Sequence, residues 1–169
     1  MKNAFLIDIV RTPRGRLSRP KKNFVGELAN VHPATLGALL VDALLDRNPS
    51  IPPEKVEDLF YSVVNANLEQ AANMGRTVVL SSRLPETTSG ITMNRACSGA
   101  LQAVAFANAS ISVGDYDLLM AGGGEHMNMV RIDKAMDPKH LPFPMDLFGK
   151  YRIGTQGDAA EMMCEKYNL

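Results

Sequence analysis

The sequence predicts a layered α/β domain with a largely parallel sheet, and three observations carry this prediction. Short apolar segments of strand length alternate with segments of helical period from residue 4 to residue 121, which is typical of α/β layers. A strand, a turn, a helix and a second strand follow one another between residues 90 and 121. The chain has 169 residues, of which 46% are hydrophobic, enough for a sizeable core in one domain.

The first half of the chain supplies two expected strands and two expected helices. A nearly continuous apolar run predicts a buried strand over residues 4–10. Leucines at helical spacing predict a helix over residues 33–46, which Pro33 is well placed to open. A strand is expected over residues 56–64 and a further helix over residues 68–82.

The segment from residue 90 to residue 124 is the centre of the chain. We expect a strand over residues 90–94, a helix from Cys97 to about Val113 and a strand over residues 116–121. Alanines and other small residues along the helix allow close approach to neighbours, so we expect it to be buried on most sides.

Cys97 is the candidate nucleophile. The expected element order places its thiol at the first turn of a helix, where unpaired N–H groups and the helix dipole favour a thiolate. The alternative is a packing residue, because free cysteine is among the most buried residue types. Position alone favours the packing role, and the surrounding sequence shifts the balance to the nucleophile. For Cys164, which lies in an amphipathic helical segment, we expect the packing role.

The turn and its surroundings resemble the thiolase family around its acyl-accepting cysteine. The family pattern is roughly N-x-x-C-x-S-G-L-x-A, then a helix ending in G-D, then a strand ending in A-G-G-x-E-x-M. This chain has Asn94-Arg95-Ala96-Cys97-Ser98-Gly99-Ala100-Leu101-Gln102-Ala103, then Val113-Gly114-Asp115 and Ala121-Gly122-Gly123-Gly124-Glu125-His126-Met127. One departure lies inside the motif, where Gly99-Ala100 replaces the family's Ser-Gly.

Three further segments extend the resemblance over essentially the whole chain. They are Arg11-Thr12-Pro13-Arg14-Gly15, Gln70-Ala71-Ala72-Asn73-Met74-Gly75-Arg76 and Gln156-Gly157-Asp158-Ala159-Ala160-Glu161. The last resembles the family's M-G-x-T-A-E, with Gln156 in place of a methionine that lines the cavity near the thiol. The resemblance therefore implies Gln156 and Met127 as residues of the substrate cavity.

The resemblance also implies the architecture. It predicts a thiolase-like half-domain over residues 1–124, with a mostly parallel, mixed five-stranded sheet and helices on its faces. Residues 125–169 are then a lid or loop region and the start of the following helix. The family's histidine base, in G-x-x-H-P, and second cysteine, in C-x-G-G-G, occur nowhere in these 169 residues. We therefore expect this chain to be an N-terminal half.

Composition excludes several classes of function. The 18 basic and 18 acidic residues balance, which argues against nucleic acid or an anionic membrane surface as the main target. The opening residues are too short an apolar run for a signal peptide or membrane span, so we expect a cytoplasmic protein. The basic loop Arg11–Lys22 either attracts cofactor phosphates or is simply solvated. No metal-ligand spacing connects His32, His126 and His140, and no cofactor is expected beyond coenzyme A thioesters as substrates.

Three hypotheses of function follow. The first is the N-terminal half of a thiolase, which exchanges acyl groups between coenzyme A thioesters through Cys97, is inactive in turnover by itself and forms a homo-oligomer when complete. The second is a fragment of a related decarboxylating ketosynthase. The third is a binding or assembly domain that keeps the fold and an idle thiol. The segment Arg11–Gly15 and the strand end Ala121–Met127 favour the first over the second.

Overall fold

The computed structural model describes residues 2–131 and 143–169. The chain divides into two compact units, Met1–Ala135 and Met136–Leu169. His140 and part of the expected lid lie outside the described residues.

A parallel sheet of three strands forms the middle of the first unit. The strands are β1 (Asp58–Ser62), β2 (Ser89–Met93) and β3 (Leu119–Gly123). Their order is β2-β1-β3, and β1 pairs in parallel with both neighbours. Ser62 is paired with Met93 on one side and with Gly123 on the other, so all three strands end at one edge. The predicted parallel α/β class is confirmed.

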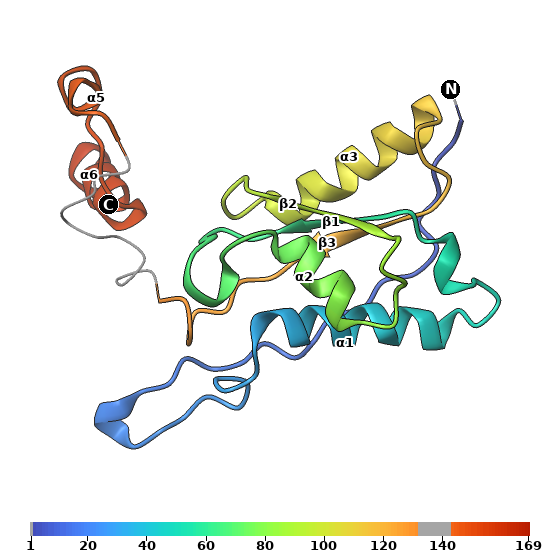
Figure 1. The fold of residues 1–169 in the computed structure, drawn as a ribbon. Helices are drawn as coiled ribbons and strands as arrows, with labels where there is room; N and C mark the ends of the chain where they lie inside the picture. Colours follow the sequence, from blue (N-terminus) through green and yellow to red (C-terminus); the bar gives the residue numbers. More distant parts are fainter. Residues whose placement is uncertain (1, 132–142) are drawn as a thin grey trace. The chain divides into compact units, whose positions relative to one another are not determined.

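Helices cover both faces of this sheet (Figure 1). The helices α1 (Pro33–Arg47) and α2 (Met74–Ser81) lie on one face, and α3 (Gly99–Val113) lies on the other. The His32 ring accepts a hydrogen bond from the Ala34 amide at 3.1 Å, which caps α1 ahead of Pro33. The apolar core lies mainly between the sheet and α1 and α2; it includes Val41, Leu45, Leu59, Tyr61, Val63, Met74, Val78 and Val79. Short 3-10 turns lie at Pro20–Lys22, Pro53–Lys55 and Leu68–Gln70.

The predicted strand over residues 4–10 is wrong, and so is the predicted count of five strands. The segment forms no strand, and a cavity of about 740 Å³ separates it from the edge of β3. Paired strands have backbones about 4.8 Å apart, and within the described residues β3 is paired with β1 and not with this segment. The apolar side chains of the segment are mostly exposed, from 60% for Ile7 to 80% for Phe5.

The predicted helix over residues 68–82 is two elements. Leu68 and Ala72 have positive φ values of 49° and 58°, a left-handed conformation that interrupts a right-handed helix. The helix α2 starts again after Asn73, whose side-chain oxygen accepts a hydrogen bond from the Arg76 amide at 3.1 Å. Capping by asparagine therefore sets the true start of α2.

The helix α3 packs on the sheet through small residues. Gly99, Ala103 and Ala107 are buried, whereas Leu101 is 73% exposed and Val113 is 68% exposed. The prediction that this helix is buried on most sides is therefore wrong for the face that points away from the sheet. The segment Ala96–Val113 is long and apolar enough to cross a membrane, judged by length and composition only. One such helix is weak evidence of a membrane span.

The second unit contains α5 (Met145–Lys150) and α6 (Gln156–Tyr167). Thr155 and Asp158 form a capping box at the start of α6, in which each side chain bonds the other's backbone N–H. The hydrogen bonds that the Asp158 carboxylate accepts from the Thr155 amide and hydroxyl hold the pKa of Asp158 below its usual value. Cys164 lies on α6 and is exposed, which differs from the packing role predicted for it.

Candidate active site

Cys97 lies in the turn that joins β2 to α3, at the edge of the sheet where the strands end. Its side chain is exposed. The residue before it, Ala96, has a φ of 45°, so the chain passes through a left-handed conformation immediately before the thiol. The helix begins at Gly99 with Ser98 as its N-cap residue. The predicted start at Cys97 is therefore two residues early.

The Asn94 side chain forms hydrogen bonds on both sides of this turn. Its side-chain nitrogen donates to the Val64 carbonyl at 2.7 Å, and its side-chain oxygen accepts from the Ala96 amide at 2.8 Å. Further along, the Ser98 amide donates to the Arg95 carbonyl at 3.2 Å, and the Gly99 amide donates to the Ala96 carbonyl at 3.2 Å. The thiol is thus presented by a turn whose backbone is hydrogen-bonded on both sides.

The start of α3 is open to an anion. The Ser98 hydroxyl donates to the Arg95 carbonyl at 3.0 Å and makes no cap with the helix N–H groups. Uncapped N–H groups together with the helix dipole form a partial positive charge. This charge favours a thiolate or an oxyanion beside the first turn.

Glu125 connects the exits of β1 and β3. Its carboxylate accepts from the Val64 amide at 2.8 Å, from the Asn65 amide at 3.2 Å and from the Asn65 side chain at 2.7 Å. Hydrogen bonds to a charged acceptor are about twice as strong as neutral ones. Since Asn94 bonds the Val64 carbonyl, Glu125 fixes the same segment that Asn94 uses as its support.

Gln70 and His126 continue this polar network inward. Gln70 is fully buried; it donates to the Asn65 carbonyl at 2.9 Å and accepts from the His126 amide at 2.6 Å. The His126 Nδ1 accepts from the Met129 amide at 3.2 Å, and its Nε2 lies 3.0 Å from the Leu28 carbonyl. This pattern assigns the proton to Nε2. Both ring nitrogens are engaged, so His126 acts here as a structural residue.

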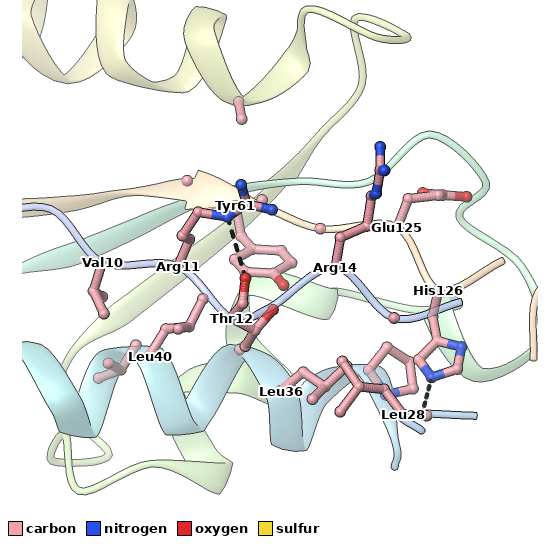
Figure 2. A pocket seen from close by; sticks show the side chains of 18 of the residues that line it. Val10, Arg11, Thr12, Arg14, Leu28, Leu36, Leu40, Tyr61, Glu125 and His126 are labelled. Atoms are coloured by element: carbon pink, nitrogen blue, oxygen red, sulfur yellow. Dashed lines mark hydrogen bonds between the residues drawn. The ribbon is translucent and has the colours of Figure 1, made fainter. Parts of the chain in front are cut away.

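A cavity of about 590 Å³ lies beside this network (Figure 2). The loop Val10–Gly15, residues of α1 and the strand exit Gly122–Asn128 line it. Tyr61 projects into it in Figure 2, and burial together with the Glu125 charge raises the pKa of Tyr61 to about 12. Met127 lines this cavity, as does Ala100, but Cys97 is not among the lining residues.

Arg11 and Arg16 of the basic loop each have a side-chain hydrogen-bond partner within the first unit. Arg16 pairs with Glu27 and stacks over Phe24, with 4.5 Å from the guanidinium carbon to the ring centroid. The hydrogen bond from Arg16 lowers the pKa of Glu27 to about 2. Arg11 and Arg14 lie at the 590 Å³ cavity, where the Arg11 Nε donates to the Thr12 carbonyl at 3.1 Å. The two interpretations of this loop, phosphate attraction and simple solvation, both stay open.

The remaining predicted cavity residue lies in the second unit. Gln156 is the first residue of α6 and is exposed, and its role in a substrate cavity stays a prediction. Sequence reasoning quoted Asn94, Gln70 and Glu125 only as parts of matching segments. Their role as hydrogen-bonded supports depends on contacts between residues that are 30 to 61 positions apart along the chain, for which no local pattern exists.

The fold and this turn define a class: a parallel α/β domain that exposes a thiol where a strand passes into a helix. The sequence profile described as "Thiolase, N-terminal domain" matches residues 5–166, and the chain belongs to this family.

Curated relatives carry the name 3-ketoacyl-CoA thiolase. The relative from Hahella chejuensis is 36% identical over 168 residues, 99% of this chain and 41% of the relative. The one from Idiomarina loihiensis is 34% identical over 169 residues, 100% of this chain and 41% of the relative. The one from Aliivibrio salmonicida is 37% identical over 137 residues, 81% of this chain and 34% of the relative. The chain thus spans about two fifths of the length of the first two.

Proposed function

We propose that this chain is the nucleophile-bearing part of a coenzyme A acyltransferase of the thiolase type, with Cys97 as the acyl acceptor. The observation that carries the proposal is the exposed Cys97 thiol beside the uncapped start of α3. The names of the curated relatives support 3-ketoacyl-CoA thioesters as the substrate class. Acyl-CoA is then both substrate and partner, and no further cofactor is required.

The proposed first step is a thioester exchange. The Cys97 sulfur attacks the acyl carbonyl carbon, the bond from that carbon to the coenzyme A sulfur breaks, and an acyl-Cys97 thioester forms. The proton of the thiol leaves with free coenzyme A. The partial charge at the start of α3 supports this step, because it favours the Cys97 thiolate before attack and the negative charge that develops on the carbonyl oxygen during attack.

Turnover needs a base and a second acid or base beside the thiol. Within the described part of the chain the nearest histidine in sequence, His126, has both ring nitrogens engaged. We therefore expect this polypeptide to become acylated at most once per chain, without sustained release of coenzyme A. Groups contributed from outside these residues would complete the cycle.

The remaining parts of the proposal concern the acyl-binding residues, the oligomeric state and the cellular location of the protein. Met127 lines a cavity in the first unit, and we propose that it contributes to acyl binding. For Gln156, in the second unit, a role in the substrate cavity is proposed from the family resemblance alone. The exposed apolar side chains of Phe5, Leu6 and Val113 support association with a further protein surface, so we propose a homo-oligomer. We also propose a cytoplasmic location.

Two alternative functions differ from this proposal in their expected behaviour. A ketosynthase needs a malonyl donor for the condensation that follows acylation. Condensation of acetyl-CoA without a malonyl donor by the completed enzyme therefore favours the thiolase type, whereas acylation of Cys97 is common to both. A binding or assembly domain would keep its role after Cys97→Ala. The replacement of the family's Ser-Gly by Gly99-Ala100 is the feature that favours the non-catalytic alternative.

The test is acylation of the isolated chain by acetyl-CoA, followed by intact mass and peptide mapping. Cys164 is a second exposed thiol in the same chain, so Cys164→Ser is the matched control for Cys97→Ser. We expect one acetyl group per chain in the unchanged protein and in Cys164→Ser, and none in Cys97→Ser. Equal labelling of both cysteines, or labelling of neither, would contradict the proposal, and sustained coenzyme A release would contradict its statement about the base.

A further inference from the structure

The first turn of α3 contacts the last residue of the central strand. A β-carbon built on Gly99 would lie 1.8 Å from the Ser62 Oγ and 2.9 Å from the Ser62 Cβ. Nonbonded heavy atoms prefer separations of about 3.5–4.0 Å. The Ser62 side chain, which is 5% exposed, therefore occupies the volume that any side chain at position 99 would need.

This contact lies at the departure inside the cysteine motif. The thiolase pattern has a serine where this chain has Gly99. In this protein a hydroxyl reaches the same volume from the opposite side, from strand β1 instead of helix α3. Within the described residues the Ser62 hydroxyl makes no hydrogen bond, so volume and close contact are what it contributes at this point.

Ser62 also lies where it can control the height of the Cys97 turn above the sheet. Its backbone is paired with the last residues of both neighbouring strands, Met93 and Gly123, and its carbonyl accepts from the Gly124 amide at 3.0 Å. The Ser62 backbone is therefore fixed. Gly99 rests on this fixed point, and its amide bonds the Ala96 carbonyl at 3.2 Å, directly before the thiol.

We propose that Ser62 acts through Gly99 as a positioning residue for Cys97. The two positions share one volume, which a side chain at position 62 or a side chain at position 99 can fill, but not both. The importance of Ser62 for acyl transfer rests on the proposed function. The packing of Ser62 against Gly99 does not depend on that function, and the packing and the acyl transfer are measured separately.

The experiment exchanges the two residues. Gly99→Ser places two side chains in one volume, Ser62→Gly empties it, and the double variant Ser62→Gly with Gly99→Ser fills it again from the helix. The rate of alkylation of Cys97 by iodoacetamide, divided by the rate for Cys164 in the same chain, reports the position of the thiol independently of acyl transfer. The denaturation midpoint is measured for each variant.

We expect Gly99→Ser to lower the alkylation ratio by roughly tenfold, the factor that corresponds to about 1.4 kcal/mol, and to lower the midpoint. The double variant is expected to return within about twofold of the unchanged protein. If Gly99→Ser fails to fold while the double variant folds, the reciprocity is supported. A double variant no better than Gly99→Ser, or an alkylation ratio that no variant changes, would overturn the proposal.

Acetyl-CoA labelling of the same proteins separates this inference from the proposed function. Rescue of the alkylation ratio without any acetylation of Cys97 would retain the Ser62–Gly99 relation and remove the acyl-transfer role. Acetylation that follows the alkylation ratio across the variants supports both.

Discussion

Asn94 ties the turn that carries Cys97 to Val64, the second residue beyond the end of β1, through a hydrogen bond of 2.7 Å from its side-chain nitrogen to the Val64 carbonyl. The same side chain accepts from the Ala96 amide at 2.8 Å. One residue thus connects the strand that precedes the thiol with the central strand of the sheet, and the left-handed Ala96 is held between them.

Replacing Asn94 with alanine should loosen this turn. We expect Asn94→Ala to lower the free energy of unfolding by about 1–2 kcal/mol, because two ordinary hydrogen bonds are lost at an exposed site. The alkylation rate of Cys97 relative to Cys164 should change in the same variant. Asn108→Ala, an exposed asparagine of α3, is the control and should stay within about 0.5 kcal/mol. Equal effects of the two substitutions would contradict this role of Asn94.

Glu125 should matter more than an exposed carboxylate on the neighbouring loop. Glu125→Gln keeps the shape but turns an N–H donor toward the donors of Val64 and Asn65. We expect a loss of about 2 kcal/mol, as for hydrogen bonds to charged groups, measured by urea denaturation. Glu69→Gln removes the same charge from an exposed site and should change stability by less than about 0.5 kcal/mol. A similar small effect for Glu125→Gln would show that its contacts are not stabilising.

The sequence was sufficient to predict the three parallel strands, α1 and the position of Cys97 at a strand-to-helix turn, because these depend on local periodicity and on one motif. It was misleading for residues 4–10. Their apolar run has the composition of a strand, but strand formation needs a partner backbone, and a cavity lies between this segment and β3. Composition specifies how apolar a segment is and not what pairs with it.

The residues that support the site were beyond local prediction for a related reason. Gln70 and His126 are 56 positions apart, and each makes its hydrogen bonds to backbone groups of loops whose course only the folded chain defines. Ser62 and Gly99 are a similar case. The glycine was visible as a departure from the motif, whereas the side chain that it contacts belongs to strand β1.

Tyr61 should make the protein less stable in alkali. Burial, with a contribution from the Glu125 charge, raises the pKa of Tyr61 from 10.0 to about 12. The tyrosine hydroxyl is neutral when protonated. Because its pKa is higher in the folded chain, the unfolded chain loses this proton first as the pH rises. The stabilisation is therefore complete below pH 10 and is lost as the pH rises from 10 to 12.

The measurement is the free energy of unfolding of Tyr61→Phe and of the unchanged protein between pH 8 and pH 12, values chosen to bracket the two states of Tyr61. The unchanged protein should lose up to about 2–3 kcal/mol more than the variant over this range, at about 1.4 kcal/mol per pKa unit. Tyr151→Phe changes a tyrosine that is 65% exposed and should leave the alkaline slope as it is. Parallel slopes for Tyr61→Phe and the unchanged protein would remove Tyr61 as the cause.

Two adjacent glycines at the end of β3 should respond differently to the same added methyl group. A β-carbon on Gly123 would lie 2.4 Å from the Ser62 carbonyl oxygen, whereas one on Gly122 meets nothing within 4 Å. Because the obstacle at Gly123 is backbone in a paired strand, it can move only by distorting the ladder that joins β1 to β3. We expect Gly123→Ala to lower the free energy of unfolding by about 1–3 kcal/mol, the range for overpacking.

Gly122→Ala is the matched control, with an expected change within about 0.5 kcal/mol. The pair also tests the proposed role of Ser62, which predicts that a shift of Ser62 is passed to Gly99 and from there to the turn before Cys97. Gly123→Ala should therefore lower the alkylation ratio of Cys97 to Cys164 as well as the stability, and Gly122→Ala should change neither. A Gly123→Ala protein that is destabilised but keeps an unchanged alkylation ratio would mean that the Cys97 turn is held by Asn94 independently of the strand beneath it.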